Sequence, residues 1–155
     1  MPLPDDFAQE CLYSPEAWFV HDLIEVDVEA SAVVGRVDTT KLGPLVDAQR
    51  EWAGHPKHFP GAIALQITGT LGQLHAVYVM GLRPTDGWAG FGTHILEARF
   101  RHLGVIGPEV LARCEATRIR KVRGTVFTDY TFTYTQEGKP IYESRQRAAW
   151  FNSGA

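Results

Sequence analysis

The sequence predicts an α+β fold in which a curved antiparallel β-sheet wraps around one long central helix. Two observations support this prediction: the apolar stretch from Phe59 to Leu82 contains no Asp, Glu, Lys or Arg, and a succession of strand-like segments follows it. The 155 residues are 45% hydrophobic and 21% charged, which is typical of a globular protein. No linker-like segment divides the chain, so we expect a single domain over residues 1–155.

The first part of the chain predicts a short helical turn, two strands and a long loop. Ser14 followed by Pro15 is typical of a helix start and indicates a turn over 15–19. Apolar and polar residues alternate over 20–38, as expected for two strands. The segment 41–60 is rich in Gly and Pro and fits a helical turn only over 45–52. An irregular segment of this length in a compact domain is unusual unless it lines a site.

The apolar stretch predicts a helix from about Gly61 to Met80 that is covered on nearly every side. Gly69 and Gly72 would each cost about 1 kcal/mol relative to Ala in an exposed helix, so their presence favours close contact with other backbone. We expect His75, inside this apolar helix, to be a core or interface histidine.

The second half of the chain predicts an antiparallel meander. Strands are expected over 88–100, 109–119, 122–135 and 140–151, and the turn at Glu137–Lys139 is expected to join the last two as a hairpin. The alternation of apolar and polar residues is interrupted at Phe127 and Thr128, which predicts a break in register there.

Composition excludes several classes of protein. The net charge of −3 gives no overall attraction to nucleic acid, and the polar residues within 59–82 disfavour a membrane span. Cys11 and Cys114 do not form a disulfide framework, and the histidines lack metal-ligand spacing, so we expect neither metal nor cofactor. The acidic N-terminal segment is unlike a signal peptide, and we therefore expect a cytoplasmic protein.

Two histidines and a Pro-Gly pair immediately precede the predicted helix, at His55, His58 and Pro60-Gly61. A helix N-terminus presents free N–H groups, and those near Gly61 can polarise a thioester carbonyl as an oxyanion hole does. A histidine at this mouth can move a proton because its pKa lies near neutrality. Gln66, one and a half turns farther along, is expected to point toward the same mouth.

The segment from His58-Phe59-Pro60-Gly61 to Gln66 resembles the catalytic segment of the 3-hydroxyacyl-carrier-protein dehydratases of fatty acid synthesis, which have the hot-dog fold. The segments 90–100, 105–108 and 120–151 are similar to their later strands and closing hairpin, so the resemblance covers about residues 18–151. It implies a homodimer with acyl sites at the subunit interface, in which His58 is the base, the Gly61 N–H polarises the carbonyl and Gln66 orients the hydroxyl or a relay water. It also implies substrate contacts along an acyl channel from Phe59, Pro60, His55, Trp88 and Phe91.

The sequence departs from this family at the helix acid, because Gln66 occupies its position and a glutamine amide hydrogen-bonds without acting as an acid. A second resemblance competes: Glu51-x-x-Gly54-His55 is similar to the Asp-x-x-Gly-His loop of hot-dog thioesterases, in which the carboxylate activates water or attacks the thioester. The leading hypothesis is a dehydratase-like enzyme acting on a 3-hydroxyacyl thioester in fatty acid or polyketide-type metabolism. The alternatives are an acyl thioesterase assisted by Glu51 and a non-catalytic acyl-thioester binding protein.

A group of basic residues lies in the second half of this mildly acidic chain: Arg99, Arg101, Arg118, Arg120, Lys121 and Arg123. One interpretation is a landing site, centred on the last four, for an acidic acyl carrier protein or the phosphates of CoA. The other is a solvated strand edge whose charges discourage aggregation.

Overall fold

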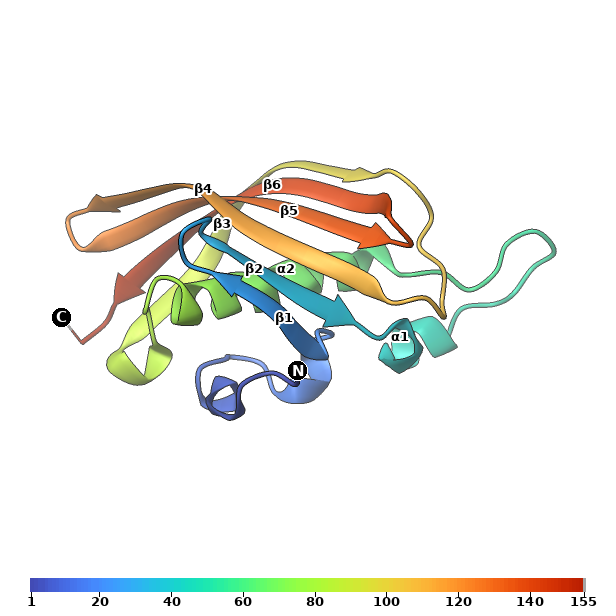
Figure 1. Cartoon of the computed structure of the whole chain (residues 1–155), viewed down its shortest axis with the longest axis horizontal. Coiled ribbons are helices and arrows are strands. Elements are labelled where there is room, and N and C mark those ends of the chain that lie inside the picture. Colours follow the sequence, from blue (N-terminus) through green and yellow to red (C-terminus); the bar gives the residue numbers. More distant parts are fainter. Residues whose placement is uncertain (155) are drawn as a thin grey trace.

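The computed structural model describes residues 1–154 and confirms one long helix against a six-stranded antiparallel sheet (Figure 1). The helix, α2, spans Gly61–Tyr78 and runs beneath the sheet. The strands lie in the order β1-β2-β4-β5-β6-β3. Their bounds are Asp22–Asp27 (β1), Ala32–Val37 (β2), Trp88–Phe100 (β3), Val110–Val122 (β4), Thr125–Gln136 (β5) and Lys139–Asn152 (β6).

Short helices occupy the connections, in agreement with the turns predicted near 15–19 and 45–52. The 3-10 helix η2 covers Pro15–Ala17 and the one-turn helix α1 covers Pro44–Asp47. The remaining 3-10 helices are η1 (Asp5–Gln9), η3 (Thr39–Lys41) and η4 (Pro84–Asp86). The loop between α1 and α2 extends from the body of the molecule at the end where α2 begins (Figure 1).

The core lies between α2 and the inner face of the sheet. Helix residues such as Ile67 and Leu71 are fully buried there, together with Val33 and Phe132 from the strands. Each such side chain contributes on the order of 1.5–3 kcal/mol on leaving water. His75 is also fully buried, as predicted, and both of its ring nitrogens are hydrogen-bonded: Nε2 lies 3.1 Å from the Ser31 carbonyl and Nδ1 lies 3.0 Å from the Tyr130 hydroxyl.

The break in register predicted around Phe127 and Thr128 is wrong. β5 alternates regularly along its whole length, with Val126, Thr128 and Tyr130 facing inward and Phe127 facing outward. Thr128 can occupy an inward position because its hydroxyl accepts a hydrogen bond from Trp150 Nε1 at 3.2 Å, so the buried polar atom is satisfied. In the pairings of β5, the irregularities fall instead in β4 between Ala116 and Arg118 and in the β5–β6 pairing at Tyr134–Thr135.

One stripe of α2 stays uncovered, in contrast to the prediction of a helix wrapped on nearly every side. Ala62, Leu65 and Gly69 are exposed, and a Cβ added at Gly69 would meet no atom within 4 Å. Leu65 and Gly69 line a cavity together with the start of β3, which is paired only to β6 within residues 1–154. The close approach that the glycines favour is therefore not supplied by the described part of this chain.

Candidate functional site

The N-terminus of α2 opens into a cavity of about 420 Å³, here called the helix-end cavity. It is lined by the loop before the helix, by the end of β3 and the segment after it, and by the start of β6. The lining residues are His58, Phe59, Gly61, Phe100 to Gly104, Ile141 and Tyr142.

A close backbone approach between two segments shapes this cavity. The Phe59 N–H donates to the Gly104 carbonyl at 2.9 Å, and His58 forms an isolated β-bridge with Val105. A Cβ on Gly104 would lie only 2.8 Å from the Phe59 Cβ, so the approach requires glycine at this position. The bulk of Phe59 is thereby buried, and the preceding His58 is fixed beside the start of α2.

Gln49 holds His58 through the backbone. Its amide donates to the His58 carbonyl at 2.8 Å and accepts from the His58 N–H at 2.8 Å. The His58 Nδ1 is buried and has no hydrogen-bond partner among the described residues. The His55 ring lies edge-on to the His58 ring at 5.6 Å, next to a tight turn between Trp52 and His55 at the exposed tip of the loop.

Gly61, the first residue of α2, lines the same cavity, so the free N–H groups of the helix start lie beside it. The N-cap is Pro60, which has no side chain able to accept a hydrogen bond from them. The positive end of the helix dipole adds to their attraction for an oxygen that gains negative charge. A Cβ on Gly61 would lie 3.2 Å from the Phe100 ring, so this ring covers the helix start.

Tyr142 forms the inner wall of the helix-end cavity. Its side chain is only 1% exposed, and its ring packs 4.7 Å from Tyr134 and 5.2 Å from Phe100. Its hydroxyl has no hydrogen-bond partner among residues 1–154. Burial raises the pKa of Tyr142, partly offset by the nearby Ser144 and Gln146, so the hydroxyl remains a proton-bearing donor at neutral pH.

A second cavity of about 360 Å³ lies farther along α2, here called the helix-side cavity. Its lining includes Leu65, Gln66, Thr68, Gly69, Gly72 and Gln73 from the helix and Gly90, Tyr130, Phe132, Gln146 and Trp150 from the sheet. A Cβ added at Gly69, Gly72 or Gly92 would meet no atom within 4 Å, so the glycines leave open space here. Both cavities border α2 and the inward residues of β6.

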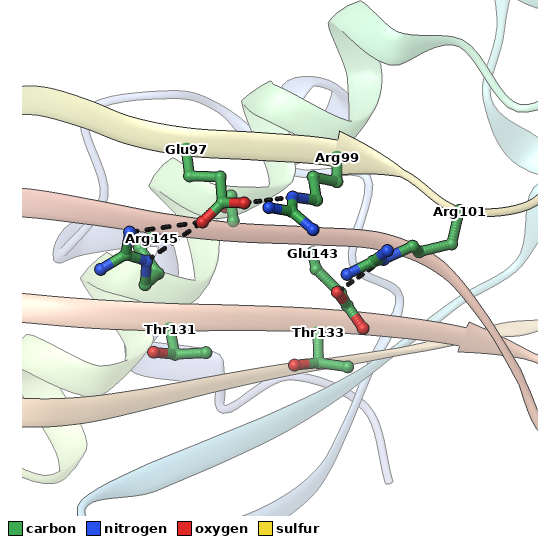
Figure 2. A pocket seen from close by; sticks show the side chains of 8 residues that line it. Glu97, Arg99, Arg101, Thr131, Thr133, Glu143 and Arg145 are labelled. Carbon is green, nitrogen blue, oxygen red and sulfur yellow. Dashed lines mark hydrogen bonds and ion pairs between the residues drawn. The ribbon is translucent and has the colours of Figure 1, made fainter.

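A groove on the outer face of the sheet, here called the outer groove, is lined mainly by charged side chains (Figure 2). Its arginines and glutamates already neutralise one another: Glu97 pairs with Arg99 and, at 3.3 Å, with Arg145, and Arg101 pairs with Glu143 at 2.9 Å. An apolar acyl group would displace water from these charges without replacing their partners. The outer groove is therefore a poorer acyl site than the two cavities along α2.

Solved structures with a similar arrangement were found by comparison. A thioesterase from Haemophilus influenzae superposes with a TM-score of 0.64 and 16% identity, covering 96% of this chain and 90% of that one. A thioesterase from Pseudomonas aeruginosa gives 0.63 and 15%, covering 97% and 96%, and a dehydratase heterocomplex from Xenorhabdus doucetiae gives 0.62 and 13%, covering 92% and 88%. The chain has the hot-dog fold. No protein-family model and no curated protein matches the sequence.

The hot-dog structure brings some of the predicted residues together. His58, Phe59 and Gly61 line the helix-end cavity, and Pro60 is the N-cap of α2 between them. His55 is exposed and approaches the cavity only through its contact with His58. Glu51 is exposed on the loop and does not line either cavity.

Gln66 does not point toward the mouth at His58. It lines the helix-side cavity, and its amide donates to the Ala17 carbonyl at 3.3 Å. The physical reason is helical rotation: five residues at about 100° each turn Gln66 roughly 140° away from the direction of Gly61. Spacing of three or four residues, rather than five, would have kept the two on one face.

Trp88 and Phe91 also lie away from the helix-end cavity. Trp88 is half-buried and packs against the core, whereas the Phe91 ring lies 6.1 Å from the Phe151 ring. Phe91 borders the helix-side cavity, so it stays near the predicted channel.

The predicted basic residues lie in two places, far apart along the strands of the sheet. Arg99 lies beside Glu143 and Thr133 in the register, whereas Arg120 lies beside Phe127, six residues earlier on β5. This separates them by about 20 Å. Arg118, Arg120, Lys121 and Arg123 are all exposed on the β4–β5 hairpin, at the end of the sheet opposite the helix-end cavity.

Within 1–154, no three His, Cys, Asp or Glu side chains gather as a metal site would require. No helix in the same part of the chain has the length and hydropathy needed to cross a membrane.

Sequence reasoning missed Gln49, Gln146 and the position of Tyr142 in the site. A glutamine in an irregular loop carries no periodic signal, so nothing in the sequence connects Gln49 with His58. The alternation of β6 does place Tyr142, Ser144 and Gln146 on one face, which could have identified them as a row facing the helix.

Proposed function

We propose that this chain hydrolyses acyl thioesters, with the thioester carbonyl bound at the N-terminus of α2 and His58 as the general base. One observation carries the proposal: His58 and Gly61, the first residue of a helix without a side-chain N-cap, line the same cavity. The thioesterases among the structures of similar fold support it as an analogy.

The chemistry of the leaving group favours hydrolysis over dehydration at this site. Thioester hydrolysis expels a thiol whose pKa is about 8.5, so one base suffices and the leaving thiolate needs little acid assistance. Dehydration expels hydroxide, whose conjugate acid has a pKa near 15.7, so it needs a positioned proton donor. No carboxyl side chain lines either cavity along α2 within the described residues.

In the proposed reaction, His58 removes a proton from a water molecule as the water oxygen attacks the carbonyl carbon. The carbonyl π electrons move to oxygen, and the oxyanion is stabilised by the N–H groups near Gly61. The intermediate then collapses, the C–S bond breaks, and the thiolate takes the proton from the His58 imidazolium. The products are a free acid and a thiol.

Dehydration of a 3-hydroxyacyl thioester is the second candidate, and the placement of Tyr142 favours it. Tyr142 lines the cavity that contains His58 and carries a protonated hydroxyl, whereas Gln66 lines the other cavity. In this reaction His58 takes the α-proton, the C–O bond breaks, and Tyr142 protonates the departing hydroxyl. Proton return from the imidazolium to Tyr142 completes the cycle.

We further propose that the chain forms a homodimer through β3. This edge strand is 13 residues long and exposes Ile95, Leu96 and Phe100, a combination that favours pairing with another strand. Antiparallel pairing of β3 with its copy would cover the open stripe of α2. It would also bring the partner's β4–β5 hairpin to the end where this chain's helix-end cavity opens, so that the basic hairpin could receive CoA phosphates or an acidic carrier protein.

Product analysis tests these proposals. Saturated acyl, 3-hydroxyacyl and 2-enoyl thioesters, each on CoA and on a carrier protein, would be incubated with the chain, with free thiol and acyl products followed by mass spectrometry. We expect free thiol and free acid, and a loss of about 10²–10⁴ in kcat for His58→Ala. His21→Ala is the control histidine, because His21 lies next to β1, away from the proposed dimer edge, lines neither cavity and accepts a hydrogen bond from the Asp38 N–H.

Each alternative gives a distinct result. Gain or loss of water without thiol release, abolished by both His58→Ala and Tyr142→Phe, would replace hydrolysis by dehydration. Saturable binding with no turnover of any thioester would indicate a non-catalytic binding protein.

A further inference from the structure

A row of polar side chains lies along the seam between α2 and β6, where an acyl chain would run. Tyr142, Ser144 and Gln146 alternate inward along β6, the Thr68 hydroxyl of α2 lies 3.4 Å from Gln146 Oε1, and Gln73 lines the same helix-side cavity farther along the helix. The row begins in the helix-end cavity at Tyr142 and reaches the helix-side cavity at Gln146. The four residue steps from Tyr142 to Gln146 correspond to about 13 Å along the strand.

Several polar atoms of this row have unused hydrogen-bonding capacity. The Tyr142 hydroxyl and Gln73 Nε2 are buried without any partner among residues 1–154. The Thr68 hydroxyl lies 3.4 Å from Gln146 Oε1 but donates its single proton to the Leu65 carbonyl at 2.6 Å. Gln146 Oε1 therefore remains able to accept a hydrogen bond, while Gln146 Nε2 donates to the Ser144 hydroxyl at 3.2 Å.

Buried polar atoms of this kind are expected to have partners, and leaving one unpaired costs about 1–3 kcal/mol. A saturated alkyl chain lying along the seam would exclude water and pair none of them. An acyl chain that carries hydroxyl or keto oxygens beyond C3 would offer both donors and acceptors at this depth.

We propose that the acyl groups accepted by this site are oxygenated along the chain, and that Tyr142 and Gln146 determine this specificity. The inference rests on the proposed function, since it assigns the acyl chain to the α2–β6 seam. It names a substrate class, acyl thioesters with hydroxyl or keto groups distal to C3, in preference to plain alkyl thioesters.

The test compares acyl groups that differ only by one oxygen atom. Decanoyl, 5-hydroxydecanoyl and 7-hydroxydecanoyl thioesters of N-acetylcysteamine would be measured for turnover and, by calorimetry with the His58→Ala variant, for binding. With the wild-type chain, we expect at least one hydroxylated thioester to exceed decanoyl by about tenfold in kcat/KM or in affinity, the factor that corresponds to about 1.4 kcal/mol.

Two variants assign the preference to the row. Gln146→Leu keeps the approximate size and removes both polar atoms, so the ratio of hydroxylated to saturated substrate should fall toward one. Tyr142→Phe removes only the unpaired hydroxyl. It should lower the same ratio without leaving a void in the packing. Thr133→Val is the matched control, because Thr133 faces the outer groove, and it should leave the ratio unchanged.

The outcomes separate the two proposals. If the wild-type protein has an equal or higher kcat/KM and affinity for the decanoyl thioester, the oxygenated-substrate inference is overturned, while thioester hydrolysis is not. A preference that survives in both Gln146→Leu and Tyr142→Phe would overturn the assignment to this row. If no thioester is bound or converted, the proposed function itself fails.

Discussion

At the scale of single residues, the position of His58 depends on Gln49. The two hydrogen bonds from one amide, both 2.8 Å, fix the His58 backbone rather than its ring. Gln49→Ala removes both bonds and frees the backbone at the cavity mouth. We expect kcat to fall by about tenfold or more with a smaller change in KM, because misplacing a catalytic group costs turnover rather than binding.

The control for this prediction is Gln9→Ala, since Gln9 is exposed at the end of η1 and lines neither cavity. Gln49→Glu gives a second test, because it keeps the acceptor for the His58 N–H but places a carboxylate against the His58 carbonyl. Equal kcat in the wild type, Gln49→Ala and Gln49→Glu would show that Gln49 does not position His58.

The buried His75 makes stability depend on pH. Burial lowers the pKa of His75 from 6.5 to about 4, so the folded chain holds it neutral while the unfolded chain binds a proton below pH 6.5. Its contribution to stability is therefore complete above pH 6.5 and is lost as the pH falls toward 4. Urea titrations over this range should show the free energy of unfolding falling by about 3 kcal/mol on account of this residue.

The same titration with His75→Gln is the control, since glutamine does not titrate. The variant is expected to be less stable at pH 7 but to have a shallower decline between pH 6.5 and 4. Some slope should persist, because burial also lowers the pKa of His21. An unchanged slope in His75→Gln would mean that His75 is not protonated on unfolding.

At the scale of elements, the loop before α2 is fixed to the segment after β3 by the contact of Phe59 with Gly104. Gly104→Ala would force a Cβ to within 2.8 Å of the Phe59 Cβ, and neither backbone can yield easily. We expect a loss of about 1–3 kcal/mol in the free energy of unfolding, together with weaker thioester binding, because the helix-end cavity is distorted. Thermal melts and calorimetry measure the two effects.

Gly92→Ala is the matched control for the effect on stability alone, since Gly92 borders the helix-side cavity. A Cβ at Gly92 meets no atom within 4 Å, and Gly92 is not among the glycines with positive φ. Its effect on stability should stay within about 0.5 kcal/mol. A Gly104→Ala variant as stable as Gly92→Ala would contradict the steric argument.

The elements themselves were largely predictable, and the reason is local periodicity. The predicted strand over 88–100 matches β3, and the predicted helix from Gly61 agrees with α2 to within two residues at its end. β5 shows where local periodicity fails as a guide, since Thr128 faces inward only because Trp150, distant in sequence, supplies its hydrogen bond. Gln66 shows another limit, because the five-residue interval from Gly61 turns it to a different face. The contact of Gln49 with His58 depends on loop geometry that no period encodes.

At the scale of the whole molecule, the two edges of the sheet differ. β1 and β3 both end the sheet, but β3 is more than twice as long and lies beside the open stripe of α2. Ile95→Glu would place a charge in the proposed dimer contact. We expect wild-type chain to behave as a dimer and Ile95→Glu as a monomer in sedimentation or light-scattering measurements.

The matched control is Ile24→Glu on the opposite edge. Ile24 is 49% exposed and Ile95 is 57% exposed, so the two substitutions change a similar isoleucine in a similar environment within one chain. Ile24→Glu should remain dimeric. A wild-type monomer, or dissociation by both variants alike, would exclude β3 as the dimer edge.

The tip of the loop before α2 gives the molecule an optical reporter. Of the four tryptophans, Trp52 is 72% exposed, whereas Trp18 and Trp150 are buried and Trp88 is half-buried. Emission from Trp52 should therefore lie to the red of the others and be quenched first by acrylamide. Trp52 pairs through its backbone with His55, which contacts His58. Binding of a ligand at the mouth of the helix-end cavity should therefore shift the Trp52 emission to the blue, without any added label.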